Sequence, residues 1–591
     1  MTRRDFLIQG STAAALAAAL PVGAAEAKPP NLLLIHTDQQ SLWTLSCYAK
    51  ELTDEPNYGE VLVETPHADR LGKEGARLTN FFTNSAVCTP SRGCLLTGRY
   101  PHSHGAYTNN LPLNRDEQTI ALLLQGHGYD TGYAGKWHLD GPPKPGFMTP
   151  ERSMGFQDCA FMFNRGHWKK MEDTPDGPKA HPYRVMGEGD NYTTDWLAHK
   201  TIDFIRKPRQ KPFFYTVSIP DPHGPITVRP PYMTMYKPED MVIPKTFPGQ
   251  IKGRPRQNEA WLRMQKARYC GLVKCIDDNV GRIIAALKER KILDDTVIVF
   301  TADHGEYMGE HGLMNKNQYY RGAYRLPFLI RWPNHIPAGL VLPQFTSNVD
   351  IQSTLLELLG FTPCGREQGK SFLPLLQGKE MAWTNEVQIH HSSRNGAAIS
   401  TPEYELILRR DTEDMLFDRK RDPEQTKNLA EDTEHDAIRK ALTAKIIAHH
   451  RETESPALAW LTGEDKKPQE TGIVFQKELL DLDTLDKPKA SFTRLLTTPR
   501  GTFRAGNKYR LTFDFESHGL KGDEANFYFT LRPGNDRSKQ TGPLKWTATK
   551  GEKGPKEHVL DTGKFNNYVL ILGIYRQGHL TVRNLKIERL P

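Results

Sequence analysis

Three short, mainly apolar runs, each followed within three residues by an aspartate, constrain the fold of this chain more than any other feature. The runs and the acidic residues after them are 31–37 before Asp38, 212–218 before Asp221, and 296–301 before Asp303. A run that is apolar throughout is typical of a strand buried on both faces of a parallel sheet. Between the runs lie helical patterns, for example at 270–290, where apolar residues recur at helical spacing. This alternation predicts an α/β domain with a mostly parallel central sheet flanked by helices.

Polar residues just after the strands indicate where a site would form. In an open parallel sheet, residues beyond the carboxyl ends of the strands converge on one crevice. The sequence places Asp38, Gln39, His223, Asp303 and His304 at such positions. We therefore expect these side chains to meet, although they are far apart along the chain.

The chain has 591 residues, which is too long for one compact core and suggests about two to four domains. We predict the α/β domain over residues 28–375. Residues 376–470 would form a small α+β subdomain and a linker, the linker being the charged, proline-containing stretch 453–472. The elements expected in this subdomain are strands near 387–391 and 404–409 and a helix over about 434–450.

Residues 471–591 show a different pattern, with apolar and polar residues alternating strictly at 509–515 and 527–531. Further strands are expected at 568–575 and 579–587. Regular short strands separated by Gly and Asn turns predict a β-sandwich that resembles a carbohydrate-binding module. Four aromatic residues there could stack on sugar rings, although alternation requires most such residues to fill a buried face: Tyr528, Trp546, Tyr568 and Tyr575.

The first 27 residues resemble a twin-arginine export signal. Arg3 and Arg4 precede an alanine-rich apolar stretch over 11–25, and Ala25-Glu-Ala27 offers a cleavage site. A membrane anchor is the alternative, but the stretch is short of the roughly 20 strongly apolar residues that a spanning helix needs. No later segment has that length, so we expect no stable membrane insertion and a periplasmic or secreted protein.

Charge and cysteine content limit the partners. The formal net charge of +8 suits an anionic substrate, but the basic residues are scattered, as they are in many soluble proteins. We find no nucleic-acid-binding motif or basic stripe, so nucleic acid is not expected as a partner. Seven cysteines in an exported protein leave at least one unpaired. Cys270 and Cys275 fit a disulfide or core thiols better than a metal site, and Cys88 is the candidate for the odd thiol.

The segment Cys88-Thr-Pro-Ser-Arg92, continuing as Gly93-Cys-Leu-Leu-Thr-Gly98, resembles the signature of the type I, formylglycine-dependent sulfatases of the alkaline phosphatase-like superfamily. The resemblance extends over about residues 30–430. It implies that Cys88 is oxidised after synthesis to formylglycine, an aldehyde. A hydrated aldehyde has two hydroxyls: one takes the sulfuryl group, and loss of the proton from the other expels sulfate and restores the carbonyl. A serine or thiol would instead keep the sulfuryl group in a stable adduct.

The resemblance also implies roles for other residues. Gly135-Lys-Trp-His138 matches the family's lysine and histidine pair, so Lys136 would bind sulfate and the modified residue, and His138 would act as the base. His223 would bind sulfate and protonate the leaving alcohol. Lys316 would be the second sulfate-binding lysine. Arg92 would hold the nucleophile and the metal, for which its fixed, charged fork is suited.

By the same resemblance, Asp38, Gln39, Asp303 and His304 form a metal cluster with the modified Cys88. The sequence departs from the commonest pattern, which has a second aspartate at the position of Gln39 and often an asparagine at that of His304. Carboxylate and amide oxygens suit a hard cation such as Ca²⁺, whereas an imidazole tolerates Mn²⁺ or another transition metal. The expectation is one Ca²⁺ ion, which would polarise the sulfate.

His102 and His104 follow the signature segment. We expect His104 to line the crevice and touch the substrate; the alternative is a turn histidine held by backbone groups. The leading hypothesis for function is a sulfatase acting on a sulfated polysaccharide or oligosaccharide. Two alternatives remain: a phosphonate monoester or phosphodiester hydrolase of the same fold, and a non-catalytic glycan-binding protein. The sequence leaves open the sugar, the sulfate position, endo or exo action and the oligomeric state.

Overall fold

The computed structural model describes residues 28–52, 63–141 and 146–464, and then 473–483, 493–497, 503, 508–520, 524–533, 541–549, 551–561, 568–575 and 578–590. The chain divides into two compact units, Met1–Thr462 and Gly463–Pro591, and each is described by itself. The predicted export signal at 1–27 lies outside the described residues.

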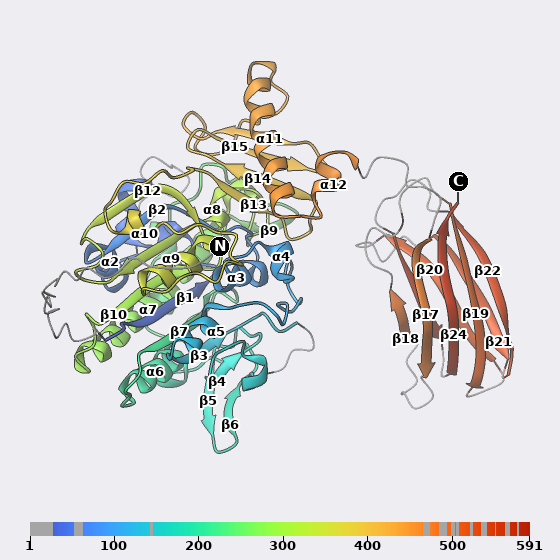
Figure 1. Cartoon of the computed structure of the whole chain (residues 1–591), viewed down its shortest axis with the longest axis horizontal. Coiled ribbons are helices and arrows are strands. Elements are labelled where there is room, and N and C mark those ends of the chain that lie inside the picture. The colour runs from blue at the N-terminus through green and yellow to red at the C-terminus, as the bar shows by residue number, and fades with distance from the viewer. Residues whose placement is uncertain are drawn as a thin grey trace, which may run out of the picture. The chain divides into compact units, whose positions relative to one another are not determined.

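The first unit is built on an eight-stranded sheet with the order β12-β2-β11-β10-β1-β7-β3-β4 (Figure 1). Its strands are β1 (Asn31–Asp38), β2 (Ala76–Phe82), β3 (Asp130–Lys136), β4 (Asp158–Phe163), β7 (Phe213–Pro222), β10 (Thr296–Ala302), β11 (Arg325–Arg331) and β12 (Leu340–Ser347). Strand β11 pairs antiparallel with both of its neighbours, and the other pairs are parallel. The three predicted strands are therefore confirmed as β1, β7 and β10, with β1 between the other two.

Helices cover both faces of this sheet, as Figure 1 shows. Because side chains alternate along a strand, Leu33 and Ile35 of β1 enter one core, and Leu32 and Leu34 enter the other. The first core is closed by α2 (Pro66–Lys73), α6 (Thr193–Arg206) and α7 (Glu259–Glu289), and the second by α3 (Cys88–Thr97), α5 (Ile120–Gly126), α9 (Ile351–Leu358) and α10 (Leu373–Leu376). The predicted α/β class is confirmed. Smaller elements are α1 (Ala49–Leu52), α4 (Pro101–His104), α8 (Arg321–Tyr324) and the hairpins β5–β6 (Met171–Thr174, Gly177–Ala180) and β8–β9 (Gln250–Ile251, Arg254–Asn258).

A four-stranded antiparallel sheet ends the first unit, in the order β13-β14-β15-β16. Its strands are β13 (Val387–His390), β14 (Gly396–Ser400), β15 (Tyr404–Arg409) and β16 (Met415–Asp418), and α11 (Asp436–Glu452) follows. Leu442 and Ile446 of α11 pack against Leu406 and Leu416 of the sheet. The predicted strands and helix are present, but part of the predicted linker is the short helix α12 (Leu458–Leu461). This stretch is ordered because Trp460 packs against the α11 core.

The second unit contains two four-stranded antiparallel sheets, in the orders β17-β24-β19-β22 and β18-β23-β20-β21. The strands are β17 (Ile473–Asp483), β18 (Thr493–Thr497), β19 (Lys508–Leu520), β20 (Glu524–Pro533), β21 (Thr541–Thr549), β22 (Lys553–Asp561), β23 (Tyr568–Tyr575) and β24 (Gly578–Arg589). The four expected strands are all present, as β19, β20, β23 and β24. In β19, Tyr509, Leu511, Phe513 and Phe515 are buried and their neighbours are not. The side chains of Tyr528, Trp546, Tyr568 and Tyr575 lie outside the described residues.

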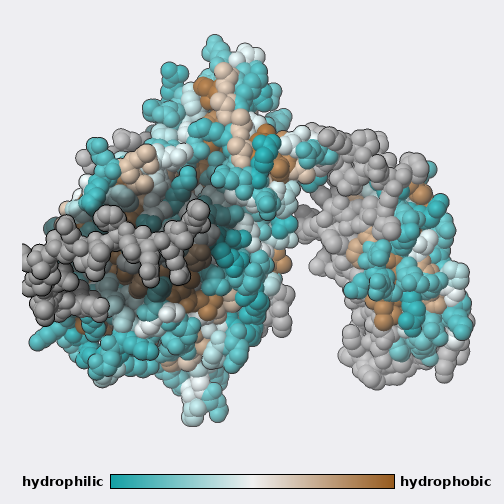
Figure 2. Space-filling view, viewed as in Figure 1, coloured by the Kyte–Doolittle hydropathy of each residue, from teal (hydrophilic) through white to brown (hydrophobic). Residues whose placement is uncertain are grey.

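Within the part of the chain that the structure describes, no helix is both long enough and apolar enough to cross a membrane. The face of the first unit drawn in Figure 2 is mostly hydrophilic. All seven cysteines are free. Cys270 and Cys275 are both buried in α7, which supports the core-thiol interpretation over a disulfide.

Candidate active site

Neighbouring strands of the central sheet deliver the predicted residues to one edge. Asp38 ends β1, Lys136 ends β3, and His223 and Asp303 directly follow β7 and β10. Because these strands are adjacent and parallel, their carboxyl ends meet there. Gln39, just after β1, has a φ of 63°, which is a left-handed backbone conformation that non-glycine residues adopt infrequently.

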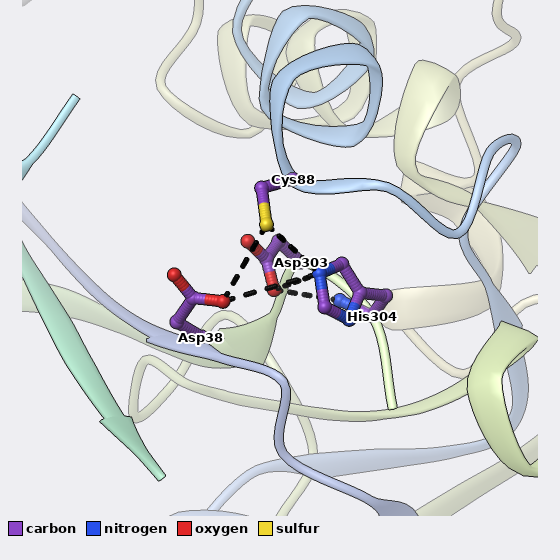
Figure 3. Close-up of side chains that lie close together, drawn as sticks. All are labelled: Asp38, Cys88, Asp303 and His304. Atoms are coloured by element: carbon purple, nitrogen blue, oxygen red, sulfur yellow. Dashed lines mark hydrogen bonds and ion pairs between the residues drawn. The ribbon is translucent and has the colours of Figure 1, made fainter. Parts of the chain in front are cut away.

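Helix α3 begins at Cys88 and points this residue into the site (Figure 3). Pro90 lies in the first turn, where its missing N–H costs no helical hydrogen bond, and Gly98 ends the helix with a φ of 63°. The Cys88 Sγ atom lies 3.2 Å from His304 Nε2 and 3.8 Å from Asp38 Oδ1. The structure therefore brings together residues separated by more than 200 positions.

Arg92, one helical turn after Cys88, is buried and binds several groups with its guanidinium fork. Nε and Nη2 lie 3.0 and 2.9 Å from Asp303 Oδ2, and Nη2 lies 3.4 Å from Asp38 Oδ2. Nη1 donates to the Lys136 carbonyl and to Ser218 Oγ, both at 2.7 Å. Arg92 thus ties α3 to four strands of the sheet, and the two carboxylates hold its pKa above the usual range against the effect of burial.

Asp38, Asp303 and His304 leave one ligand atom each directed at a common point beside Cys88. Oδ2 of both carboxylates faces Arg92, whereas His304 Nε2 lies 3.9 Å from Asp38 Oδ1 and 3.5 Å from Asp303 Oδ1. His304 Nδ1 donates to the Gly305 carbonyl at 3.0 Å, which leaves Nε2 free to act as a ligand. The ligand atoms of Asp38, Cys88, Asp303 and His304 all lie within 4.8 Å of one another. Two buried carboxylates and an imidazole nitrogen form a set of ligands that fits a divalent cation.

The charges of the site act on the Cys88 thiol. Burial and the Asp38 carboxylate raise its pKa, but Lys136, Lys316 and His304 outweigh them and lower the pKa to about 6. Burial also acts to raise the pKa of Asp38, yet Lys136, His223, His167 and Arg92 hold it well below its usual range. The site is therefore one in which cationic side chains stabilise negative charge at position 88 and on its neighbours.

Two lysines flank this centre, and each is paired with a histidine. Lys136 Nζ contacts Asp38 Oδ2 and lies 3.1 Å from His167 Nε2. Lys316 Nζ donates to Gln39 Oε1 at 2.5 Å and lies 2.8 Å from His223 Nε2.

The two imidazoles stack face to face, with ring centres 3.9 Å apart and planes only 5° from parallel. Both predicted lysines and His223 are thus in place, and His167 joins them.

His138 is buried beside these groups, with a left-handed φ of 60°. Its carbonyl accepts from Thr89 Oγ1 at 2.8 Å, next to Cys88. Neither ring nitrogen has a hydrogen-bond partner among the described residues. Burial, together with Lys136 and Arg92, lowers its pKa to about 2, so the imidazole is neutral at neutral pH.

His104 does not join the site. Its ring is fully buried and packs against Gly93 of α3, where a Cβ atom would collide with the ring. Nδ1 accepts from the Ala106 N–H at 3.2 Å, and Nε2 lies 3.3 Å from the Pro90 carbonyl. This position does not fit contact with substrate, and it matches the alternative of a turn histidine held by backbone groups. The reason is the glycine at 93, which leaves room for the ring beneath the helix.

Sequence reasoning missed three residues that contact the site: His167, Ser218 and Glu306. His167 follows β4, which is the next parallel strand beyond β3, so a polar residue after the apolar run at 161–163 was the available signal. Ser218 lies within β7 and binds Arg92. Glu306 is buried and accepts from the amide of Gln39.

Comparison with known proteins identifies the family. The family model described as Sulfatase matches residues 30–361, which is more than half of the chain. The chain belongs to the sulfatase family. Its members hydrolyse sulfate esters, and this sulfatase is accordingly a sulfuric ester hydrolase. A second model, described as N-sulphoglucosamine sulphohydrolase, C-terminal, matches residues 309–452, a range that includes β13 to β16 and α11.

Individual relatives span most of the same region. An N-acetylglucosamine-6-O-sulfatase of Bacteroides thetaiotaomicron is 27% identical over 489 residues, covering 68% of this chain and 83% of the relative. An ulvan-active sulfatase of Formosa agariphila is 27% identical over 441 residues, covering 71% of this chain and 81% of the relative. The crystal structure of a phosphonate monoester hydrolase of Agrobacterium radiobacter has a TM-score of 0.60 at 24% identity, over 72% of this chain and 96% of that one. This last likeness shows the fold alone.

Proposed function

We propose that this sulfatase is an exported enzyme that removes sulfate from a sulfated polysaccharide or oligosaccharide, with Cys88 converted to formylglycine as the nucleophile. The observation that carries the proposal is the position of Cys88. It starts a buried helix, lies against the Asp38, Asp303 and His304 ligand set, and is flanked by Lys136 and Lys316.

The reaction follows from these positions. One hydroxyl of the hydrated aldehyde at residue 88 gives up its proton to solvent, and its oxygen forms a bond to sulfur as the bond between sulfur and the alcohol oxygen of the ester breaks. Lys316 contacts His223, and the Asp38, Asp303 and Glu306 carboxylates act against burial to raise the pKa of its ammonium group. This pair supplies the proton that the leaving alcohol takes up. The second hydroxyl then loses its proton to His138, whose ring nitrogens have no hydrogen-bond partner among the described residues, the carbonyl forms again and sulfate leaves.

Arg92, Lys136 and Lys316 also provide the positive charge that a sulfate group needs. Lys136 and Lys316 each contact one of the two stacked histidines, His167 and His223, and the sulfate would be bound by both lysines. Their fixed positions in a buried site stabilise the charge that develops on the sulfuryl oxygens.

A divalent cation, for which we propose Ca²⁺, would be held by Asp38, Asp303, His304 and residue 88, with Gln39 beside them. When bound, it would polarise the sulfate and lower the pKa of the attacking hydroxyl. Removing it with a chelator should lower the melting temperature of the enzyme, and a titration with Ca²⁺ and Mn²⁺ followed by calorimetry should show which ion binds more tightly.

The carbohydrate substrate is supported by the relatives, whose names specify an N-acetylglucosamine sulfate and ulvan. The test is sulfate release, measured by ion chromatography, from a panel of sulfated monosaccharides and polysaccharides. Peptide mass spectrometry of the same preparation would show whether residue 88 is an aldehyde, and Cys88→Ala is the inactive control. Full activity with an intact thiol at residue 88 would refute the proposed chemistry.

Assays on the same preparation distinguish two alternative functions from the proposed one. Much faster turnover of an aryl phosphonate than of the matched aryl sulfate would indicate a phosphonate monoester hydrolase instead. An unmodified Cys88 with glycan binding and no turnover would indicate a binding protein. The presence of Lys136 and His138 favours a sulfate ester over a phosphonate monoester as the substrate.

Export is proposed from the paired arginines at the start of the chain and the alanine-rich stretch that follows. Changing Arg3 and Arg4 together to lysine should retain the precursor inside the cell, which cell fractionation would show. Unchanged fractionation would refute a twin-arginine route.

A further inference from the structure

Two arginines near the site, Arg394 and Arg165, form no ion pair with any described residue. Several other partly or fully buried arginines of the first unit contact carboxylates: for example, Arg229 lies 2.8 Å from Asp195, and Arg331 lies 2.6 Å from Glu74. A guanidinium is always charged, so one that is partly buried without a counter-charge is an open place for an anion.

Arg394 is held rigidly in the turn between β13 and β14. Its φ of 62° is left-handed, its N–H donates to the His391 carbonyl at 2.9 Å, and its carbonyl accepts from Trp460 Nε1 at 3.1 Å. The guanidinium carbon lies 3.3 Å from the centre of the Tyr107 ring, which supports one face of the fork. Nε is buried and has no hydrogen-bond partner in the described structure. The side chain is therefore positioned before any ligand arrives.

Both segments that meet at this stack also contact the catalytic centre. On the Tyr107 side, Asn109 Oδ1 accepts from the Thr89 N–H at 3.1 Å, immediately after Cys88. On the Arg394 side, His391 Nε2 contacts the Asn317 carbonyl at 3.1 Å, immediately after Lys316. Arg394 thus lies at the edge of the site, between the segment that carries the nucleophile and the segment that carries a sulfate-binding lysine.

Arg165 approaches the same edge from β4. It lies two residues before His167, and its Nη1 donates to Asn110 Oδ1, three residues after Tyr107. The side chain is partly exposed, which leaves its remaining N–H groups open to a ligand. The two arginines therefore flank one short segment, 107–110, that lies beside Cys88.

We propose that Arg394 and Arg165 bind a second anionic group of the substrate, a carboxylate or a further sulfate, carried beyond the ester group that is hydrolysed. The inference rests on the proposed carbohydrate sulfatase function and narrows its substrate class to polyanionic glycans. An arginine fork binds carboxylate and sulfate oxygens in pairs, so either anion fits. Hydrolysis requires only the one sulfate ester at the catalytic centre. The two arginines would instead make the enzyme prefer substrates that carry a second anion.

The experiment compares matched substrates that differ by one anion. The probes are sulfated hexosamine monosaccharides, a neutral sulfated disaccharide, and chondroitin and heparin disaccharides with one and with two sulfates. The uronic disaccharides are used with the carboxylate free and with the carboxylate reduced to an alcohol. We expect kcat/KM of the wild type to be at least about tenfold higher for the member of a pair with the extra anion, the size of one charge-assisted contact. The carboxylate and sulfate pairs tell the two anions apart.

The variants test which residues cause this preference. In Arg394→Ala and Arg165→Ala we expect the ratio of kcat/KM within a pair to fall about tenfold. Arg394→Lys keeps the charge without the fork and should give an intermediate ratio. Arg184→Ala is the matched control, because Arg184 also stacks on a tyrosine, Tyr183, on an exposed segment after β6. For Arg184→Ala, the ratio of kcat/KM within a pair should match that of the wild type. We use this ratio because a merely structural defect would lower kcat/KM equally for both substrates of a pair.

Each other result overturns the inference. The wild type could hydrolyse sulfated sugars equally well with and without a second anion, or the arginine variants could keep the wild-type preference. Either result would show that Arg394 and Arg165 do not form such a subsite, while the carbohydrate sulfatase function would still stand. If no sulfated carbohydrate releases sulfate, the proposed function fails and this inference fails with it.

Discussion

A cluster of histidines at the contact between the central sheet domain and the antiparallel sheet makes a quantitative prediction about acid stability. His102 of α4, His390 of β13, and His449 and His450 of α11 pack together around Tyr100. His390 Nε2 and His449 Nε2 are 2.9 Å apart, which requires at least one of these rings to be neutral. Protonation of the cluster would place like charges together within a buried contact.

Burial lowers the pKa of His450 to about 4, with a further contribution from His102, and burial lowers the pKa of His449 to about 3. In the unfolded chain a histidine has a pKa of about 6.5. As the pH falls below about 6.5, the unfolded state takes up protons that the folded state refuses, so the folded state loses stability until the pH reaches the folded pKa. Above about pH 7.5 both states are neutral and the penalty disappears.

The perturbation is His450→Phe. His450 lies on the α11 face that carries Leu442 and Ile446, and its Nδ1 has no hydrogen-bond partner, so a phenyl ring continues an apolar stripe and leaves no partner unsatisfied. At pH 5.5, protonation of one unfolded-state histidine favours unfolding by RT ln(1 + 10), about 1.4 kcal/mol, and at pH 7.5 by less than about 0.1 kcal/mol. The variant should therefore gain about 1.3 kcal/mol relative to the wild type between these two pH values, whatever its stability at pH 7.5.

Urea unfolding followed by tryptophan fluorescence measures this difference in the first unit, because Trp546 is the only one of the nine tryptophans that lies after residue 463. His335→Gln, at an exposed histidine, is the control and should leave the pH dependence unchanged. If His450→Phe and the wild type differ by the same free energy at pH 5.5 and pH 7.5, His450 does not titrate differently in the folded state, and the reasoning from burial is refuted.

Three further substitutions test the site and its support. Lys136→Met should lower kcat/KM for an aryl sulfate by about 100-fold or more, because it removes a fixed positive charge from the buried site; a change below about tenfold would contradict this role. Gly135→Ala should destabilise the protein by about 2 kcal/mol or more in urea unfolding, because φ is +107° and the new Cβ would collide with the Ser218 carbonyl. Gly126→Ala is the control and should not destabilise the protein, because no atom lies within 4 Å of the new Cβ. Asp221→Asn should cost about 3–5 kcal/mol, because Lys169 then loses the carboxylate at 2.5 Å and is left as a buried, uncompensated charge; an unchanged urea midpoint would refute this.

The fold could be predicted because two periodicities in the sequence correspond to burial. The runs at 31–37 and 296–301 each contain four consecutive apolar residues, at 32–35 and 297–300, and their strands are buried on both faces. Strand β14 (Gly396–Ser400) was missed because glycine and small residues leave no such pattern. It forms because β13 and β15 pair with it on either side.

The site could be predicted where a residue directly follows a strand or lies in the signature helix, because the sheet then determines its place. His104 was misassigned since its position depends on the space left by Gly93, a packing fact that spacing along the chain does not contain. His167 was missed for a related reason: its stack on His223 joins segments 56 positions apart, and neither segment alone indicates the other. Histidine is ambiguous in a sequence because a buried neutral ring and a catalytic ring have the same neighbours in the chain.

Gln39 departs from the family's commonest pattern, and the structure supplies a physical reason for the departure. Its Nε2 contacts the buried carboxylate of Glu306, which leaves Oε1 to accept from Lys316. An aspartate at this position would face Glu306 with a second carboxylate, and two negative charges buried side by side repel. The amide instead donates to one neighbour and accepts from the other, so its oxygen is directed at the site by the contact behind it.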